Sequence, residues 1–119
     1  MNIEEFREYC LAKKGATESF PFDEKTLVFK VMGKMFSLSG LERIPTEINL
    51  KCDPERSMEL REDYDGLIYS GYHMSGKHWN TLKIESLPPK LVMQLIDHSY
   101  ELVVAKLTRK LKAELEALD

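Results

Sequence analysis

The chain has 119 residues, 43% of them hydrophobic, which suits a single domain over residues 1–119 with one apolar core. Its net charge of −3 excludes a surface that is basic throughout, so a site for nucleic acid or anionic lipid would have to be local. The charge is in fact segregated, because residues 1–24 carry −3 and residues 25–52 carry +3.

Two cysteines, Cys10 and Cys52, stand 42 positions apart without a Cys-x-x-Cys pair or a Cys/His cluster. We therefore expect buried, reduced thiols and neither a zinc site nor a disulfide. The acidic N-terminus lacks the apolar segment of a secretory signal, and no apolar run approaches the roughly 20 residues of a membrane span. These features predict a cytoplasmic protein without membrane contact.

The first predicted element is a helix over residues 3–13. Asn2 is its expected N-cap, and Glu5 stands at the third helical position, as in a capping box. Residues 16–25 contain a proline and read as an irregular connection to the first strand. Two aromatic side chains of this connection are expected to fold back on the core: Phe20 and Phe22.

A β-hairpin follows, because the hydrophobic period changes to two from Thr26 onward. Gly33-Lys34 predicts a two-residue type II′ turn, which pairs Met32 with Met35. In that register five apolar residues share the core face: Leu27, Phe29, Val31, Phe36 and Leu38. The opposite face is mixed and partly polar, and it includes Lys30 and Ser37.

The remaining segments complete an antiparallel arrangement. They are a third strand (46–52), a helix capped by Asp53 (to residue 64), two strands (67–70 and 78–84) and a long helical region that opens at Pro88 and breaks or bends near Thr108. The clean alternation of the strands requires only one covered face. The expected fold class is therefore α+β with two layers, α-β(3)-α-β(2)-α, in which helices cover one face of a five-stranded antiparallel sheet.

Several short runs spread along the chain also carry a family resemblance. They are Pro21-Phe22, Thr26-Leu27-Val28-Phe29-Lys30-Val31 with Gly33-Lys34-Met35-Phe36, Leu50-Lys51 before Asp53-Pro54-Glu55, Lys77-His78-Trp79, and Ser99-Tyr100. By these runs the chain resembles the MmcQ/YjbR family of small bacterial proteins. The resemblance implies a two-layer fold of the frataxin and secretion-chaperone type and a DNA-binding label with two wing-like hairpins. It implies no catalytic residues.

The outward strand positions predict one candidate binding surface. Its residues are Lys30, Ser37, Asn49, Lys51, Trp79, Thr81 and Lys83. Lysines would neutralise phosphates and an aromatic ring would stack on a base, so these side chains suit nucleic acid. The lysines expected to lead binding from the strands and hairpin tips are Lys30, Lys34, Lys51, Lys77 and Lys83. The same pattern also fits an ordinary solvated strand face on which Trp79 closes an edge of the core, and the sequence leaves both interpretations open.

The glycine-containing loop His73-Met74-Ser75-Gly76-Lys77-His78 would suit an anion, or histidines that bond to loop carbonyls. The spacing of His73, His78 and His98 does not indicate a metal site. No nucleophile elbow or phosphate loop appears, and the paired acids Glu62-Asp63 and Asp65 belong to a solvated helix end. We therefore expect no enzyme, no metal and no cofactor. The expected function is non-catalytic DNA binding. The alternative is a chaperone-like or regulatory protein-binding module, monomeric or weakly dimeric. It would use the acidic 53–65 helix or a C-terminal leucine stripe formed by Leu107, Leu111, Leu115 and Leu118.

Overall fold

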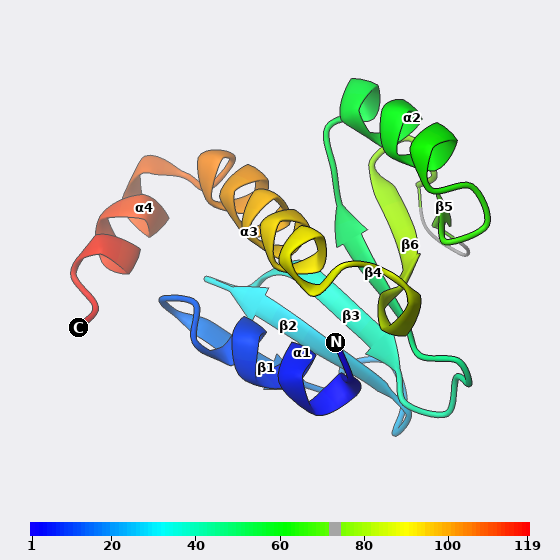
Figure 1. The fold of residues 1–119 in the computed structure, drawn as a ribbon. Helices are drawn as coiled ribbons and strands as arrows, with labels where there is room; N and C mark the ends of the chain where they lie inside the picture. The colour runs from blue at the N-terminus through cyan, green and yellow to red at the C-terminus, as the bar shows by residue number, and fades with distance from the viewer. Residues whose placement is uncertain (72–74) are drawn as a thin grey trace.

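The structure, a computed structural model, describes residues 1–71 and 75–119. It is an α+β fold in which helices cover one face of an antiparallel sheet (Figure 1). The elements are α1 (Ile3–Leu11), β1 (Ala16–Ser19), β2 (Thr26–Val31), β3 (Lys34–Gly40), β4 (Glu47–Lys51), α2 (Pro54–Asp63), β5 (Ile68–Ser70), β6 (Trp79–Lys83), the 3-10 helix η1 (Ile84–Ser86), α3 (Pro89–Ala105) and α4 (Arg109–Glu116).

The sheet in the described residues has six strands in the order β1-β2-β3-β4-β6-β5, and all neighbours are antiparallel. The predicted fold class is confirmed, but the predicted strand count of five is wrong. The additional strand is β1, which lies in the segment expected to be irregular and pairs from Ala16 opposite Val31 to Ser19 opposite Val28. With four mostly polar residues, β1 has no apolar alternation that would reveal it.

The β2–β3 turn lies one residue earlier than predicted. It consists of Met32 and Gly33, whose φ angles are 49° and 81°. Positive φ at both central residues is the requirement of a type I′ turn, which matches the twist of a hairpin. Val31 therefore pairs with Lys34, and the predicted type II′ turn at Gly33-Lys34 is wrong.

A β-bulge at Phe36 changes which side chains of β3 lie on each face of the sheet. The strand carries one residue more than β2 in their ladder, so Phe36 has no partner of its own in β2. Ser37 therefore lies on the helix side, where it accepts a hydrogen bond from the Cys10 thiol at 3.7 Å. Leu38 pairs with Val28 on the opposite face, so the predictions of an inward Leu38 and an outward Ser37 are wrong. The other four predicted core residues do lie in the core: Leu27, Phe29, Val31 and Phe36.

Helix α1 begins as predicted, because Asn2 and Glu5 form a reciprocal capping box. Its buried residues Phe6 and Cys10 face the sheet, and the Phe6 and Phe29 rings meet edge to face at 5.4 Å between centroids.

Both cysteines are buried free thiols, which confirms that prediction. None of the helices in residues 1–71 and 75–119 is long and apolar enough to cross a membrane.

The loop between β1 and β2 does not fold back on the core. Phe20 and Phe22 are 47% and 66% exposed, so their predicted burial is wrong. Local polar bonds fix this loop, because the Asp23 carboxylate accepts the backbone N–H groups of Lys25 at 2.8 Å and Thr26 at 2.7 Å. The loop is closed by its own turn and leaves the aromatic rings at the surface.

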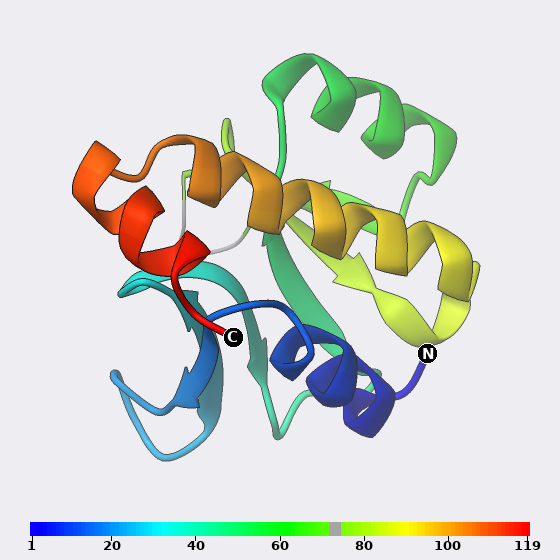
Figure 2. The ribbon, with the colours of Figure 1, turned by 90° about the vertical axis from the view of Figure 1, so that its left-hand side faces the viewer.

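The predicted break in the C-terminal helical region is confirmed. Thr108 caps α4 by accepting the N–H of Leu111 at 3.2 Å. Helix α4 then turns back toward the start of β1 (Figure 2), where the Lys14 ammonium donates to the Glu116 carbonyl at 3.0 Å. Of the leucine stripe, Leu107 and Leu115 are buried in the core, so most of this face packs on the protein itself.

Candidate nucleic-acid interface

A groove lies where the β2–β3 turn approaches the C-terminal end of α3. Its volume is about 290 Å³. The lining comes from the hairpin, the last residue of β4, the first residue of β6 and the end of α3: Gly33, Lys34, Met35, Lys51, Trp79, Val103 and Lys106. Lysines from three separate segments thus meet in this hairpin-end groove.

The groove opens where β3 and β4 separate. Their ladder ends at Ser37 opposite Leu50, and the next pair in the same register would be Phe36 with Lys51. Instead, the hydroxyl of Ser99 from α3 accepts the Lys51 N–H at 2.9 Å and donates to the Phe36 carbonyl at 2.5 Å. The buried Ser99 hydroxyl thus replaces one rung of the ladder and ties α3 to both strands.

A second hollow of about 200 Å³ lies beside the groove and shares Lys51 and Lys106 with it. Its other lining residues are Cys52, Asp53, Pro54, His78 and Leu102. The Asp53 carboxylate is engaged, because it caps α2 by accepting the Arg56 N–H at 3.1 Å. The two lysines therefore stand between two adjacent hollows.

In the described part of the chain, the lysines of the groove have no carboxylate partner. Within residues 1–71 and 75–119, no ion pair involves Lys34, Lys51 or Lys106. Burial, and then the charge of Lys106, lower the pKa of Lys51. An anion bound between the two ammonium groups would favour their charged forms and would relieve their mutual repulsion.

A neutral histidine supports the floor beside the second hollow. The backbone N–H of Asp53 donates to Nε2 of His98 at 3.1 Å, so this nitrogen carries no proton. Burial, and then the nearby Arg56, lower the pKa of His98, which favours the same neutral form. His98 therefore anchors the turn between β4 and α2 to helix α3 and adds no positive charge to the site.

Trp79 lies on the predicted face of β6, opposite Lys51 of β4. It is only 8% exposed, so little of the ring is available to solvent. The tryptophan is the first residue of β6, an interior strand, and contributes an apolar wall to the groove. Its role as a stacking platform for bases stays a prediction. The lysines around it are better suited to contact phosphates.

The other predicted lysines are spread over the sheet. Lys30 is half-buried on β2 opposite Met35, close to the hairpin turn. Lys83 lies four residues along β6 from Trp79, about 13 Å away at strand geometry, and its ammonium is 5.9 Å from the centre of the Tyr69 ring. Lys83 also pairs across the sheet with Glu47. The predicted strand face is therefore not uniformly basic, and Lys83 lies apart from the groove.

The loop before β6 contributes to the site only in part. Lys77 is exposed, and the next residue, His78, lines the second hollow. The predicted role of His73 in this loop falls outside the described residues. In the part of the chain that is described, no three side chains of His, Cys, Asp or Glu gather as a metal site would require.

Two polar residues of α3 and its C-terminal end, Lys106 and Ser99, were not assigned to the site from the sequence. Lys106 follows Val103 by three positions and continues the buried stripe of α3 onto the same face, which was a usable signal. Ser99 belongs to the same stripe, but its role depends on the bulge at Phe36 and could not be read from spacing.

Comparison with known proteins identifies the family of the chain. The model of the YjbR family matches residues 11–102. The uncharacterized protein YbdF of Escherichia coli O157:H7 is 39% identical over 92 residues, 76% of this chain and 75% of that protein. The uncharacterized protein YjbR of Escherichia coli K12 is 33% identical over 106 residues, 87% of this chain and 88% of that protein. The chain belongs to the YjbR family.

The fold of this YjbR-family chain also matches solved structures. The crystal structure of Deinococcus radiodurans protein DR2400, a DUF419 domain, aligns with a TM-score of 0.90 at 36% identity and covers 97% of this chain and 88% of that one. A protein from Pseudomonas syringae aligns with a TM-score of 0.73 at 28% identity over 86% of this chain and 98% of that one. The YjbR match includes Lys34, Lys51 and Trp79 but ends before Lys106.

Proposed function

We propose that this YjbR-family protein binds nucleic acid without catalysing a reaction, and that the hairpin-end groove holds the sugar–phosphate backbone. One observation carries the proposal: Lys34, Lys51 and Lys106 converge from three segments, with no ion-pair partner for any of them in the described residues. Placing like charges together is unfavourable unless an anion joins them. A polyanion such as DNA supplies closely spaced phosphates.

The location of the lysines supports a contact with an extended ligand. Lys34 is exposed beside the hairpin turn, Lys106 is exposed at the end of α3, and the half-buried Lys51 lines the same groove. Lys77 is exposed before β6 and extends the positive charge. The resemblance to proteins with wing-like hairpins favours the same end of the molecule. Because Trp79 is nearly buried, we expect phosphate contacts to dominate over base stacking.

A pair of triple variants tests this assignment. One variant, K34Q/K51Q/K106Q, removes the lysines of the groove. The matched variant, K25Q/K83Q/K90Q, removes three charges that lie outside the groove lining, before β2, at the end of β6 and at the start of α3. Lys90 stands in the first turn of α3, about 24 Å along the helix from Lys106. Both variants have the same net charge, so a difference between them reports location.

Fluorescence anisotropy of labelled duplex DNA over a range of salt concentrations measures the affinity of each variant for DNA. If each groove lysine neutralises one phosphate, the magnitude of the slope of log K against log salt falls by about 2.7 in the groove variant. We expect little change in the matched variant and similar effects on different DNA sequences. Equal losses in the two variants would indicate a diffuse interface that includes Lys83, and no binding at low salt would contradict the proposed function.

A further inference from the structure

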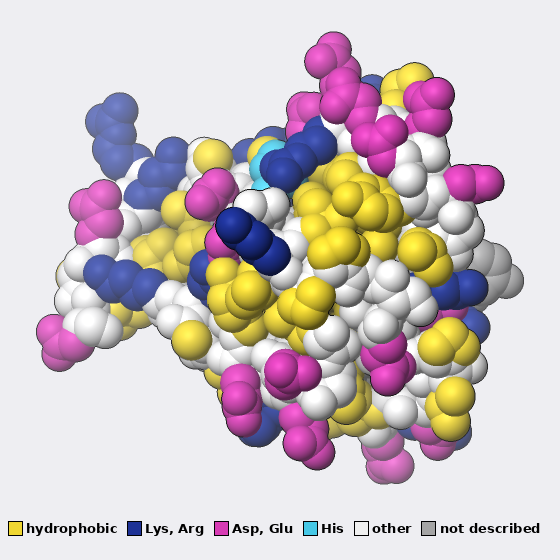
Figure 3. Space-filling view, viewed as in Figure 1, with side chains coloured by type: hydrophobic (Ala, Val, Ile, Leu, Met, Phe, Trp, Pro, Cys, Tyr) yellow, Lys and Arg dark blue, Asp and Glu magenta, His cyan; other side chains and the backbone are white. Residues whose placement is uncertain are grey.

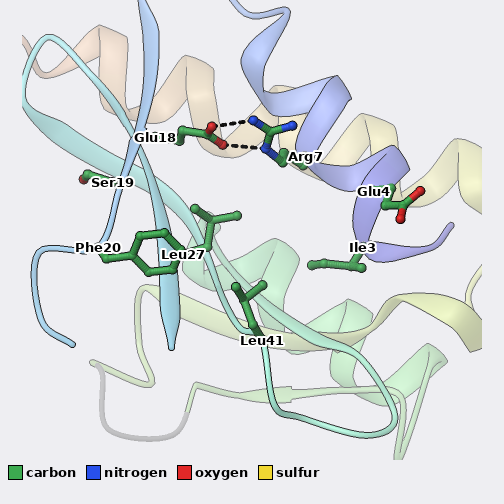
Figure 4. A pocket seen from close by; sticks show the side chains of 8 residues that line it. All are labelled: Ile3, Glu4, Arg7, Glu18, Ser19, Phe20, Leu27 and Leu41. Carbon is green, nitrogen blue, oxygen red and sulfur yellow. Dashed lines mark hydrogen bonds and ion pairs between the residues drawn. The ribbon is translucent and has the colours of Figure 1, made fainter. Parts of the chain in front are cut away.

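A separate cleft lies between α1 and the ends of β1, β2 and β3. Its volume is about 450 Å³, within the range of ligand-binding pockets. Figure 4 shows Ile3 and Phe20 pointing into it from opposite sides, with Leu27 and Leu41 between them. The Arg7–Glu18 pair closes one end through bonds of 2.7 and 2.5 Å. We call this hollow the α1 cleft.

Large apolar side chains surround the α1 cleft without being covered. Phe20 and Leu41, which line it, are almost half exposed. Phe22 and Ile44 lie in the same two loops and are 66% and 95% exposed. These loops meet, because the Leu41 N–H donates to the Lys25 carbonyl at 2.8 Å. A cluster of this kind on a protein surface is typical of an interaction site.

The surroundings of the cleft are acidic. Helix α1, strand β1 and the two loops carry seven carboxylates against three basic side chains: Glu4, Glu5, Glu8, Glu18, Asp23, Glu24 and Glu42, with Arg7, Lys25 and Arg43. Figure 3 shows the carboxylates gathered over α1. Two of the basic groups are already engaged, Arg7 with Glu18 and Lys25 with Glu42, so the surplus charge around the cleft is negative.

We propose that the α1 cleft docks a short segment of a partner protein in which large apolar side chains are flanked by lysine or arginine. The apolar side chain would enter between Ile3, Phe20 and Leu41, where it removes apolar surface from water. The flanking cations would lie against Glu4 and the other carboxylates of α1.

The negative charge around the cleft favours such a segment over two other ligands, nucleic acid and a second copy of the chain. The negative surroundings repel the phosphates that the hairpin-end groove would attract, so the α1 cleft is not a second nucleic-acid site. A second copy docked through the same end would bring the two carboxylate clusters together. Such like-charge contacts disfavour the pairing.

The test uses three fluorescein-labelled peptides, whose binding is measured by anisotropy at physiological salt. The first is Lys-Lys-Leu-Phe-Leu-Lys-Lys. The second replaces its lysines by glutamate, and the third replaces its apolar residues by serine. We expect the first peptide to bind at least about tenfold more tightly than the serine peptide, because loss of one large apolar contact alone is worth about that factor. It should also bind more tightly than the glutamate peptide, whose carboxylates would be repelled by those around the cleft.

Two cleft variants and two matched variants locate the binding. Leu41→Ser removes an exposed apolar wall and should weaken binding of the first peptide about fivefold or more. Glu4→Gln removes one carboxylate of the lining and should weaken it about twofold. Met58→Ser and Glu55→Gln make the same two changes on α2, another acidic helix, and should leave binding unchanged.

Four results would overturn the proposal. They are failure of the first peptide to bind at millimolar concentration, equal binding of the serine peptide, equal effects of the α1-cleft and α2 variants, and a dimer in sedimentation velocity that Leu41→Ser dissociates. The last result would assign the cleft to a second copy of the chain.

Discussion

Replacement of Ser99 by alanine removes the hydroxyl that bridges β3 and β4 at the edge of the groove. The change deletes one oxygen and leaves no steric conflict, so its effect comes from the two hydrogen bonds. The Phe36 carbonyl loses its donor, and the Lys51 N–H loses its acceptor. Both groups lie where the sheet register would pair them with each other if the strands did not separate.

The expected loss follows from the burial of these two groups. An unsatisfied buried polar group costs about 1–3 kcal/mol. The Phe36 carbonyl bond is buried and the Lys51 N–H bond is partly buried, so the second group can recover part of its loss from water. Together they predict a loss of about 2–4 kcal/mol in the free energy of unfolding, a large share of the roughly 5–15 kcal/mol of a typical domain.

Urea denaturation followed by circular dichroism measures this loss. With a slope of about 2 kcal/mol per molar urea, the middle of the usual range, the midpoint should fall by about 1–2 M at unchanged slope. Ser86→Ala is the control, because Ser86 is exposed in η1, and it should change stability by less than about 0.5 kcal/mol. A Ser99→Ala midpoint equal to that of the control would refute the bridging role of Ser99.

Three further changes address the core, the hairpin and the pH response. Phe29→Ala should cost about 3–5 kcal/mol in urea denaturation, because the ring is fully buried between two other phenylalanine rings. Gly33→Ala should cost about 1–2 kcal/mol, since its φ is 81° with open space around it, whereas Gly40→Ala, without a positive φ, should cost less. Burial and Arg56 lower the pKa of His98 in the folded state, so the unfolded chain protonates first and stability should fall as the pH drops below about 6.5. His98→Gln should remove that part of the pH dependence, and an unaltered midpoint profile would contradict the account.

The sequence predicted the parts of the fold that depend on local chemistry. The capping box at Asn2, the N-cap at Asp53 and the break near Thr108 each depend on a side chain that satisfies a nearby backbone group. Alternation in β4 and β6 was long enough to assign both faces, as the pairing of Lys51 with Trp79 shows. Each of these sequence signals lies entirely within one short segment of the chain, so no distant residue is needed to interpret it.

The errors arise where distant segments decide the local structure. The bulge at Phe36 is stabilised by Ser99, which lies 63 residues later in the sequence. No pattern within β3 therefore predicts the bulge. The bulge moves Ser37 inward and Leu38 outward, although both residue types fit either face. The α1 cleft likewise combines a helix with the ends of three strands, and only their arrangement in space leaves Phe20 exposed beside it.

The candidate groove was predictable only as a list of side chains. Lys34, Lys51 and Trp79 were expected at a binding surface, and the fold brings these three together. Their meeting with Lys106 depends on how α3 crosses the sheet (Figure 2), which helical periodicity indicates but does not fix. Lys83 shared the predicted face but lies at the other end of β6.

A two-dimensional NMR titration of the labelled protein with duplex DNA tests the central claim most directly. The account predicts that the backbone amide signals of Lys34, Lys51 and Lys106 shift together and saturate at one affinity. The amides of α2 and of the α1 cleft should stay in place, because both regions are acidic. Shifts confined to α2 or to the α1 cleft, or no shifts at low salt, would contradict the assignment of the hairpin-end groove to nucleic acid.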